Sequence, residues 1–539
     1  MAITIVRRML CVACACAFLV VGCARTVPAP PPTTVGTFDL EEVTIGELQQ
    51  RMQSGRDTAR SLVDKYLARI AAIDAAGPSL HSVIEINPDA RAIADALDAE
   101  RKATGPRGPL HGIPVLIKDN IATADKMQTT AGSLALEGAT PPADAFIVAK
   151  LRAAGAVILG KTNLSEWANF RSTHSTSGWS GRGGLTKNPY ALDRNPSGSS
   201  SGSGAATAAN LCAISVGTET DGSITSPANN NGLVGLKPTL SLVSRFGIVP
   251  IAHSQDTAGP MTRTVADAAA LLTVLAGTDP NDTATTDAKA KATDYTRALD
   301  PNGLKGARIG VVRAKLMGYH PQTDALIEQA IADLKKLGAE IVDPADIPHV
   351  GEYDDSEFNV LEYEFKTDLE KYFAWLGPKA PVKTMQDVIA FDNAHADREL
   401  VFFGHEILEQ SVKKGPLTER AYLDALARNQ RLSRAEGIDA VMNRLKLDAL
   451  IAPTGHPAWV TDTVNGDHTI GSATTPAAVA GYPHITVPAG QVNGLPVGLS
   501  FFGRAWTEAT LIKFAFAYEQ ATKHRKPPTL APSIGGPVR

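Results

Sequence analysis

The chain has 539 residues, of which 44% are hydrophobic and 20% are charged, and its formal net charge at pH 7 is −4. This is the composition of a globular protein that is large enough to bury a core without disulfides, and a chain of this length can form one large α/β domain. Acidic and basic residues are interspersed without a basic stripe, so the sequence predicts no nucleic-acid partner.

Residues 1–22 have the pattern of a signal peptide. Arg7 and Arg8 form a basic start, and the apolar run at 10–21 that follows is too short to span a bilayer comfortably. The V-V-G-C sequence that ends at Cys23 resembles a bacterial lipoprotein cleavage site, where the cysteine receives lipid. We therefore expect an exported, periplasmic protein with a possible outer-membrane lipid anchor at Cys23; ordinary signal cleavage nearby is the alternative.

Four of the five cysteines lie within the first 23 residues, and only Cys212 lies in the body of the chain. The body therefore has no candidate for an internal disulfide or a thiolate metal site, and we expect no metal and no organic cofactor. The Pro/Thr-rich segment 23–37 is typical of an extended tether. A single domain over 38–527, a tail over 528–539 and a monomeric state complete the expected organisation.

Short apolar runs and amphipathic stretches alternate along this domain. The spacing of apolar residues predicts helices at 62–73, 144–154, 204–210, 324–337 and 508–521. Short β-rich runs predict strands at 113–117, 156–159, 211–216, 232–236, 247–251, 308–312, 449–452, 485–487 and 498–502. Residues 350–445 have a mainly helical pattern, and the polar segment 277–303 is typical of a surface excursion. The alternation favours a layered α/β fold.

Two short motifs suggest other functions. Residues 155–162 match the phosphate-binding pattern G-x-x-x-x-G-K-T, but the residues between the glycines have the pattern of a strand, and a helix precedes them, which is not the order of a P-loop. We interpret this segment as a core strand whose end presents Lys161, Thr162 and Asn163. Residues 198–202 match G-x-S-x-G around Ser200, yet the preceding residues contain two prolines and favour a loop rather than the strand that a nucleophile elbow needs.

A third arrangement has the chemistry of a serine nucleophile activated by lysine. A serine hydroxyl needs a base, and no histidine lies within residues 195–226. Lys118 directly follows the apolar run 113–117, and burial would lower its pKa toward a range useful for a base. A second serine can relay the proton, because a hydroxyl both donates and accepts. The glycine-containing segment 220–223 can aim backbone N–H groups at an oxyanion.

The blocks 108–121, 195–206 and 217–239 together resemble the amidase signature family, and so do 254–269, 480–490 and 494–512. The resemblance implies an α/β/α sandwich around a mixed β-sheet in a single large domain. It implies that Lys118 is the base, Ser199 the bridging serine after a cis peptide, and Ser223 the nucleophile. It also implies that the oxyanion donors are the backbone amides of Thr220, Asp221, Gly222 and Ser223. Because the sequence reads S-G-S-S-S-G-S at 197–203, Ser200 is an alternative to Ser199.

The segment E-T-D-G-S at 219–223, the segment K-T-N-L-S-E-W-A-N-F-R at 161–171 and the signal peptide together resemble the bacterial peptide amidase branch of this family. The resemblance implies deamidation of C-terminal peptide amides without a partner protein. We expect the substrate pocket to include Trp167, Asn169, Phe170 and Arg171. Amidases of small aryl or aliphatic amides, and an inactive peptide-binding lipoprotein of the same fold, remain alternatives.

Overall fold

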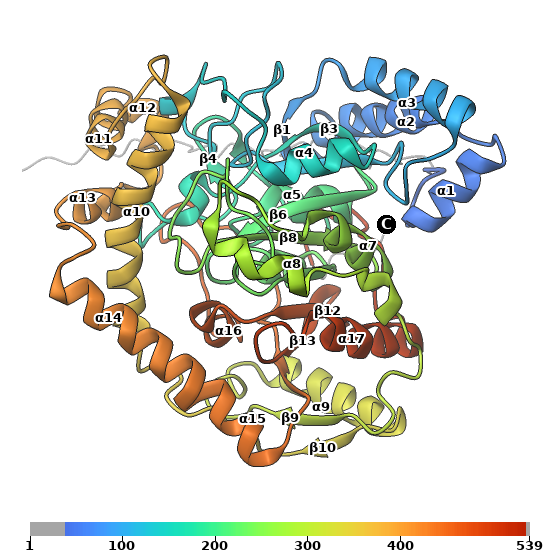
Figure 1. Ribbon diagram of the computed structural model, residues 1–539, viewed down its shortest axis with the longest axis vertical. Helices are drawn as coiled ribbons and strands as arrows, with labels where there is room; N and C mark the ends of the chain where they lie inside the picture. The colour runs from blue at the N-terminus through green and yellow to red at the C-terminus, as the bar shows by residue number, and fades with distance from the viewer. Residues whose placement is uncertain (1–37, 535–539) are drawn as a thin grey trace, which may run out of the picture. The chain divides into compact units, whose positions relative to one another are not determined.

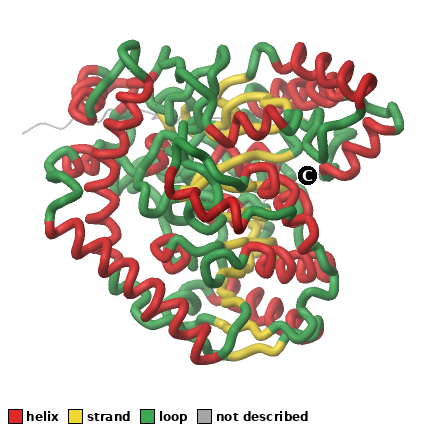
Figure 2. The backbone as a smooth tube through the Cα atoms, viewed as in Figure 1, coloured by secondary structure: helices red, strands yellow, loops and turns green. Residues whose placement is uncertain are grey.

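A mixed sheet of eleven strands runs through the protein, which is described by a computed structural model for residues 38–534 (Figures 1 and 2). In sheet order the strands are β1 (Val83–Ile86), β3 (Val157–Thr162), β2 (Pro114–Lys118), β6 (Ile214–Glu219), β8 (Thr257–Thr262), β7 (Val234–Lys237), β12 (His484–Val492), β13 (Leu495–Phe502), β11 (Ala449–Pro453), β9 (Arg308–Val311) and β10 (Glu340–Val342). Strands β3, β2 and β6 are mutually parallel, as are β10, β9 and β11, while the pairs between them are antiparallel. A separate two-stranded ribbon is formed by β4 (Trp179–Ser180) and β5 (Gly184–Leu185).

Helices cover the sheet and its edges. They are α1 (Ile45–Gln53), α2 (Ala59–Arg69), α3 (Ala90–Thr104), α4 (Phe146–Ala153), α5 (Ser201–Ala208), α6 (Thr225–Asn230), α7 (Val265–Leu275), α8 (Ala288–Lys291), α9 (Pro321–Lys336), α10 (Asp354–Leu376), α11 (Met385–Ala394), α12 (Ala396–Glu399), α13 (Glu406–Ser411), α14 (Arg420–Gln430), α15 (Asp439–Leu445), α16 (Thr475–Ala480) and α17 (Glu508–Thr522). The long α10 stands beside the sheet with α11, α13 and α14 (Figure 1). No helix within residues 38–534 has both the length and the apolar character needed to cross a bilayer.

Both faces of the sheet are buried. Along β11, Ala449 and Ile451 belong to the largest apolar cluster, with α2, α3, α4, α7, α9 and α17, whereas the alternate residues Leu450 and Ala452 pack against α15 and α16. Successive strand residues point to opposite faces, so this alternation requires a layer of helices on each face. The expected α/β/α sandwich around a mixed sheet is confirmed.

Most predicted elements are present with shifted ends, and one is wrong. Residues 247–251 form no strand, because Gly247 has a positive φ of 77°, Pro250 lacks a backbone donor and only Ile248 makes a single bridge, to Ile121. This apolar segment is a loop that lines a cavity instead. The predicted strand at 211–216 begins later, at Ile214, and continues to Glu219, which brings its end to the segment 220–223.

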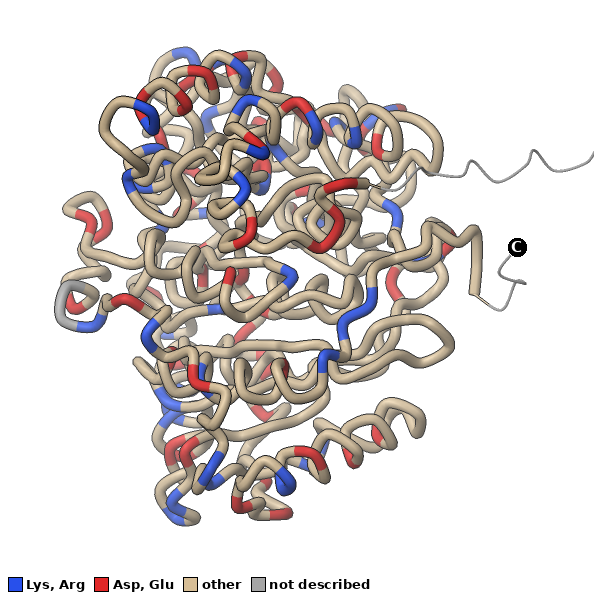
Figure 3. The backbone as a smooth tube through the Cα atoms, turned by 90° about the vertical axis from the view of Figure 1, so that its right-hand side faces the viewer, with Lys and Arg blue, Asp and Glu red and all other residues tan. Residues whose placement is uncertain are grey.

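The two ends of the sequence differ in what the structure describes. The expected signal peptide, the tether and Cys23 lie outside the described residues. At the other end, the first part of the expected tail is packed: the Leu530 N–H donates to Pro189 O, and the Leu192 N–H donates to Ala531 O. Lys and Arg are interspersed with Asp and Glu over the described chain (Figure 3), in keeping with the mixed charge of the sequence.

Candidate active site

The residues singled out by the sequence meet at the carboxyl ends of two parallel neighbouring strands. Lys118 is the last residue of β2, and β6 ends at Glu219, one residue before the segment 220–223. In an open α/β sheet, the loops after parallel strands gather at one edge and form the usual ligand site. The segment that carries Ser199 and Ser200 precedes α5, which packs against both strands.

Lys118 is fully buried and points at hydroxyl groups. Its Nζ lies 2.8 Å from Ser199 Oγ and 2.9 Å from Thr218 Oγ1. Burial lowers the pKa of Lys118 to about 7, and the carboxylates of Asp256 and Glu219 counteract part of that shift. A substantial fraction of this amine is therefore neutral near physiological pH and able to accept a proton.

The structure distinguishes Ser199 from Ser200. The Gly198–Ser199 peptide bond is cis, as expected, and Ser199 Oγ is the serine oxygen that contacts Lys118. Ser200 Oγ is instead engaged with the backbone of β6: it donates to Thr218 O at 3.0 Å and accepts from the Thr218 N–H at 3.2 Å. The Ser200 N–H donates to Ser223 O at 3.2 Å, so the two serine segments are joined directly.

The segment 220–223 forms a tight turn with free backbone donors. Gly222 adopts a φ of +77°, which glycine accommodates without strain. Glu219 Oε2 accepts from the backbone N–H groups of Ile224 at 2.8 Å and Thr225 at 2.9 Å, and thereby fixes the far end of the turn. The N–H groups of Asp221, Gly222 and Ser223 have no acceptor among residues 38–534. Several such donors in one turn can bind an oxyanion.

A cavity of about 280 Å³ opens beside this turn. Its wall includes Ser199, Thr220, Asp221 and Ser223, together with Asp354, Glu357, Phe358 and Leu361 of α10. A second cavity, of about 370 Å³, reaches Asn120 and Thr218 near Lys118 and shares Ala168, Thr220 and Ile251 with the first. The structure thus places a buried lysine that can be neutral, two serines and unpaired backbone N–H donors beside one cavity.

The four expected pocket residues divide into two pairs. Asn169 and Phe170 line the smaller cavity. Trp167 and Arg171 are not among its lining residues: Trp167 is 1% exposed and packs edge-on against Phe373, and Arg171 is buried in ion pairs with Glu166 and Glu399. These two side chains hold the segment in place rather than face the cavity.

Sequence reasoning missed the α10 residues of the cavity wall, because it treated the helical region only as a whole. The signal was the spacing of Asp354, Glu357, Phe358 and Leu361, which places them on one helical face. A helical face that carries both acidic and large apolar residues is neither a typical core face nor a typical solvent face, so this pattern could have indicated a binding surface.

The competing motif at 155–162 has no phosphate-binding geometry. Residues Val157–Thr162 form the buried strand β3, as interpreted from the sequence. Lys161 Nζ donates to Ile121 O at 2.7 Å and to Thr129 Oγ1 at 2.8 Å, so its donors serve the core.

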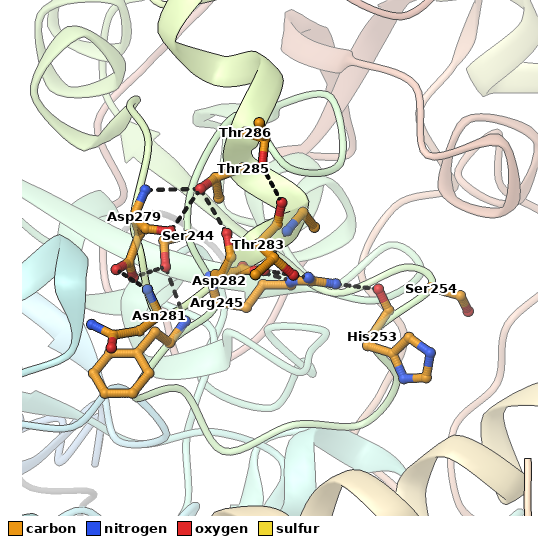
Figure 4. A network of polar contacts seen from close by, with 12 residues as sticks. Ser244, Arg245, His253, Ser254, Asp279, Asn281, Asp282, Thr283, Thr285 and Thr286 are labelled. Atoms are coloured by element: carbon orange, nitrogen blue, oxygen red, sulfur yellow. Dashed lines mark hydrogen bonds and ion pairs between the residues drawn. The ribbon is translucent and has the colours of Figure 1, made fainter.

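The loop that contains residues 247–251 lies on the rim of the larger cavity, and a polar network around Arg245 holds it there (Figure 4). Arg245 pairs with Asp282 at 2.6 Å and donates to the backbone oxygen of His253. His253, Glu364 and Asp368 lie close enough together to hold a metal ion. However, His253 Nδ1 is 2.6 Å from Asp368 Oδ2, and the Ser254 N–H donates to Glu364 Oε2, so these groups already tie the loop to α10.

The chain is similar to known amidases over most of its length. A sequence profile of the family described as Amidase matches residues 61–512. The structure of a native peptide amidase from Stenotrophomonas maltophilia has a TM-score of 0.88 and 51% identity, with 92% of this chain and 100% of that chain covered. The structure of an amidase family protein from Bacillus anthracis has a TM-score of 0.82 and 38% identity, with 91% of this chain and 92% of that chain covered. A probable amidase of Arabidopsis thaliana is 43% identical over 503 residues, which cover 91% of this chain and 92% of the relative.

Proposed function

The chain belongs to the amidase signature family and is a hydrolase of amide C–N bonds, and from that premise we propose that it is an exported serine amidase that deamidates C-terminal peptide amides. The roles proposed are nucleophile for Ser223, relay for Ser199 and base for Lys118. The observation that carries the proposal is the 2.8 Å contact between the buried Lys118 Nζ and Ser199 Oγ, beside a cavity that both serines line.

In the first half of the proposed reaction, neutral Lys118 accepts a proton from Ser199 while Ser199 takes the proton of Ser223. The Ser223 oxygen attacks the amide carbonyl, and the resulting oxyanion is bound by the N–H groups of Thr220, Asp221, Gly222 and Ser223. The relay then returns the proton to the leaving nitrogen, and the C–N bond breaks to release ammonia. Preorganised donors of this kind are worth about 3–4 kcal/mol each in the transition state.

In the second half, water attacks the acyl-enzyme by the same relay and releases the free acid. Lys118 regains its neutral form at the end of the cycle, so it acts as a catalyst and is not consumed. The substrate assignment is supported by the likeness to the Stenotrophomonas protein, which is a peptide amidase. The signal-peptide and lipoprotein patterns of the sequence support export and an anchor at Cys23.

Nucleophile and base are tested by Ser223→Ala and Lys118→Met. We expect each to lower kcat by about 10³-fold or more, because such groups act as one unit. Lys161→Met is the matched control, since Lys161 is an equally buried lysine that contacts neither serine. A fluorophosphonate probe should label the wild type at Ser223, as located by mass spectrometry. Full activity in Ser223→Ala would refute the assignment.

The substrate class is tested by ammonia release from a panel of peptide amides, free-acid peptides, fatty amides and aryl amides. We expect peptide amides to give the highest kcat/KM and free-acid peptides to give none. A preference for fatty or aryl amides would overturn the peptide-amide assignment and leave the amidase assignment intact.

A further inference from the structure

We propose that the cavity beside Ser223 selects peptide amides whose C-terminal residue carries a cationic side chain, and that Glu357 binds the positive charge. This inference rests on the proposed function, because it takes that cavity as the site of the acyl group. It concerns Glu357 of α10, which lines the same cavity as the proposed nucleophile.

The charge of the cavity wall is of one sign. Asp221, Asp354 and Glu357 line it, and no Lys, Arg or His does. None of these three carboxylates forms an ion pair with a basic group of residues 38–534, although 35 such pairs occur elsewhere in that part of the chain. A substrate that enters the cavity therefore meets carboxylates whose charge the protein leaves unpaired.

Glu357 is the most constrained of the three. It is 7% exposed, and its Oε1 accepts from Gln255 Nε2 at 2.8 Å. Gln255 Nε2 also donates to Thr220 O at 3.3 Å, so Glu357 is fixed to the turn that carries Ser223. Its Oε2 accepts no hydrogen bond from the described residues. This oxygen is not among the buried side-chain atoms that lack a partner, so it is accessible from the cavity and can accept a hydrogen bond from a ligand.

The structure also offers a purely local role for acidic residues here. Asp354, Asp355 and Glu357 all lie in the first turn of α10, where the helix dipole favours negative charge. That role is satisfied by the exposed Asp354 and Asp355, and it does not require a side chain that is buried against a cavity. Asp355, which lies in the same turn but does not line the cavity, therefore separates the two roles experimentally.

The rest of the wall matches the stem of such a side chain. Phe170, Phe358 and Leu361 provide apolar surface beside Glu357. The aliphatic part of a lysine or arginine side chain packs on apolar surface while its head group seeks a carboxylate. A peptide amide that ends in lysine or arginine fits this combination better than one that ends in an acidic residue, which would be repelled.

The two buried carboxyls of the wall also influence each other. Burial raises the pKa of Asp221 to about 6, and burial together with the nearby Asp221 carboxylate raises the pKa of Glu357 well above its usual range. The other charged groups that act on this pair are Asp354, Glu219 and Lys237, and Gln255 donates a hydrogen bond to Glu357. A carboxyl whose pKa is raised ionises at higher pH, and only the ionised form binds a cation strongly, so the preference for cationic substrates should increase with pH.

The test compares N-acetyl-alanyl-lysine amide with N-acetyl-alanyl-norleucine amide, which differ by the ammonium group alone. For the wild type we expect kcat/KM to favour the lysine substrate by about 10-fold, the effect of one charge-assisted contact. Glu357→Gln keeps the shape of the side chain and should bring the ratio close to 1. Asp355→Asn removes a charge from the same helical turn and should keep the wild-type ratio.

The outcomes separate the two proposals. Equal kcat/KM for the two substrates in the wild type, or an unchanged ratio in Glu357→Gln, would overturn the role of Glu357 and leave the amidase proposal standing. Hydrolysis of neither substrate, with no fluorophosphonate label on Ser223, would overturn the proposed function and with it this inference. Because both substrates are acetylated at the N-terminus, an α-ammonium group cannot produce the preference. That group is tested separately by comparing leucine amide, which has a free amine, with N-acetyl-leucine amide. If the wild type prefers leucine amide and Glu357→Gln abolishes this preference, Glu357 binds the α-ammonium group instead, and the proposed side-chain selectivity is wrong.

Discussion

The side chain of Lys118 is fully buried at the end of β2, and burial holds its pKa at about 7. The neutral amine is the form that accepts a proton, so the reactive fraction increases with pH. With a neutral peptide amide as substrate, we expect kcat/KM to rise about 10-fold per pH unit below pH 7 and to level off above it. A pH–rate profile from pH 5 to 9 measures this, and a flat profile would contradict the role of Lys118 as base.

Gly222 is the residue whose backbone shape the turn needs most. Its φ is +77°, and an added Cβ would lie 3.0 Å from Ser226 Oγ and 3.1 Å from Thr474 Oγ1. We expect Gly222→Ala to lower kcat by about 10²-fold, because it displaces the oxyanion donors. Gly55→Ala is the control, since Gly55 has a similar φ of +75° but no atom near the added Cβ. Equal kcat values in the two variants would argue against the turn as the oxyanion site.

For single residues, the sequence predicted which side chains are candidates for catalysis, but it did not predict which atoms they contact. Lys118 stood out as a lysine directly after an apolar strand, and its contact with Ser199 is seen in the structure. The choice between Ser199 and Ser200 depends on which hydroxyl contacts Lys118 and on the backbone contacts of Ser200, which no residue pattern encodes. Trp167 and Arg171 look like recognition residues in sequence, yet burial shows them in packing and ion-pair roles.

At the scale of elements, a buried ion cluster links the segment after β3 to the region around α12. Arg171 pairs with Glu166 and Glu399 and donates to the backbone oxygen of Gly404 at 3.2 Å. Removal of the one cation would leave two carboxylates buried together. The cluster anchors the residue that directly follows Asn169 and Phe170, two residues of the cavity wall.

We expect Arg171→Ala to lower the free energy of unfolding by about 3–5 kcal/mol, as measured by chemical denaturation. Arg420→Ala is the control: its partner is Asp424, both side chains are exposed, and such a pair contributes about 0.2–1 kcal/mol. If Arg171→Ala kept full stability but lost affinity for substrate, the sequence-based expectation of a pocket role would be restored.

The elements themselves were predictable where their pattern was strong. The helices α9 and α17 and the strands β9, β11 and β13 follow the periodicity closely. The prediction of a strand at 247–251 was wrong, because a run of apolar residues that lines a cavity has the same sequence pattern as a buried strand. The short strand β1 was not predicted, because its residues are only half-buried and its pairing with β3 is remote in sequence.

For the whole molecule, the expected export gives a prediction that is independent of catalysis. If Cys23 carries lipid, the mature protein should fractionate with membranes and its N-terminal peptide should have the mass of a lipidated cysteine. Cys23→Ser should release the protein into the soluble periplasmic fraction with kcat unchanged, because the catalytic groups lie within residues 118–223. A soluble wild-type protein whose N-terminus lies elsewhere would contradict the anchor.

The direct link between Ser200 and Ser223 has a consequence for how the gene can change. Helix α5 and strand β6 occupy most of the chain between Ser199 and Ser223, and their two ends are joined by the Ser200 N–H and Ser223 O. One residue inserted into α5 would turn everything after it by about 100°, and one inserted into β6 would exchange its two faces. Insertions and deletions within α5 or β6 are therefore disfavoured by geometry, because either would move Ser199 and Ser223 relative to each other.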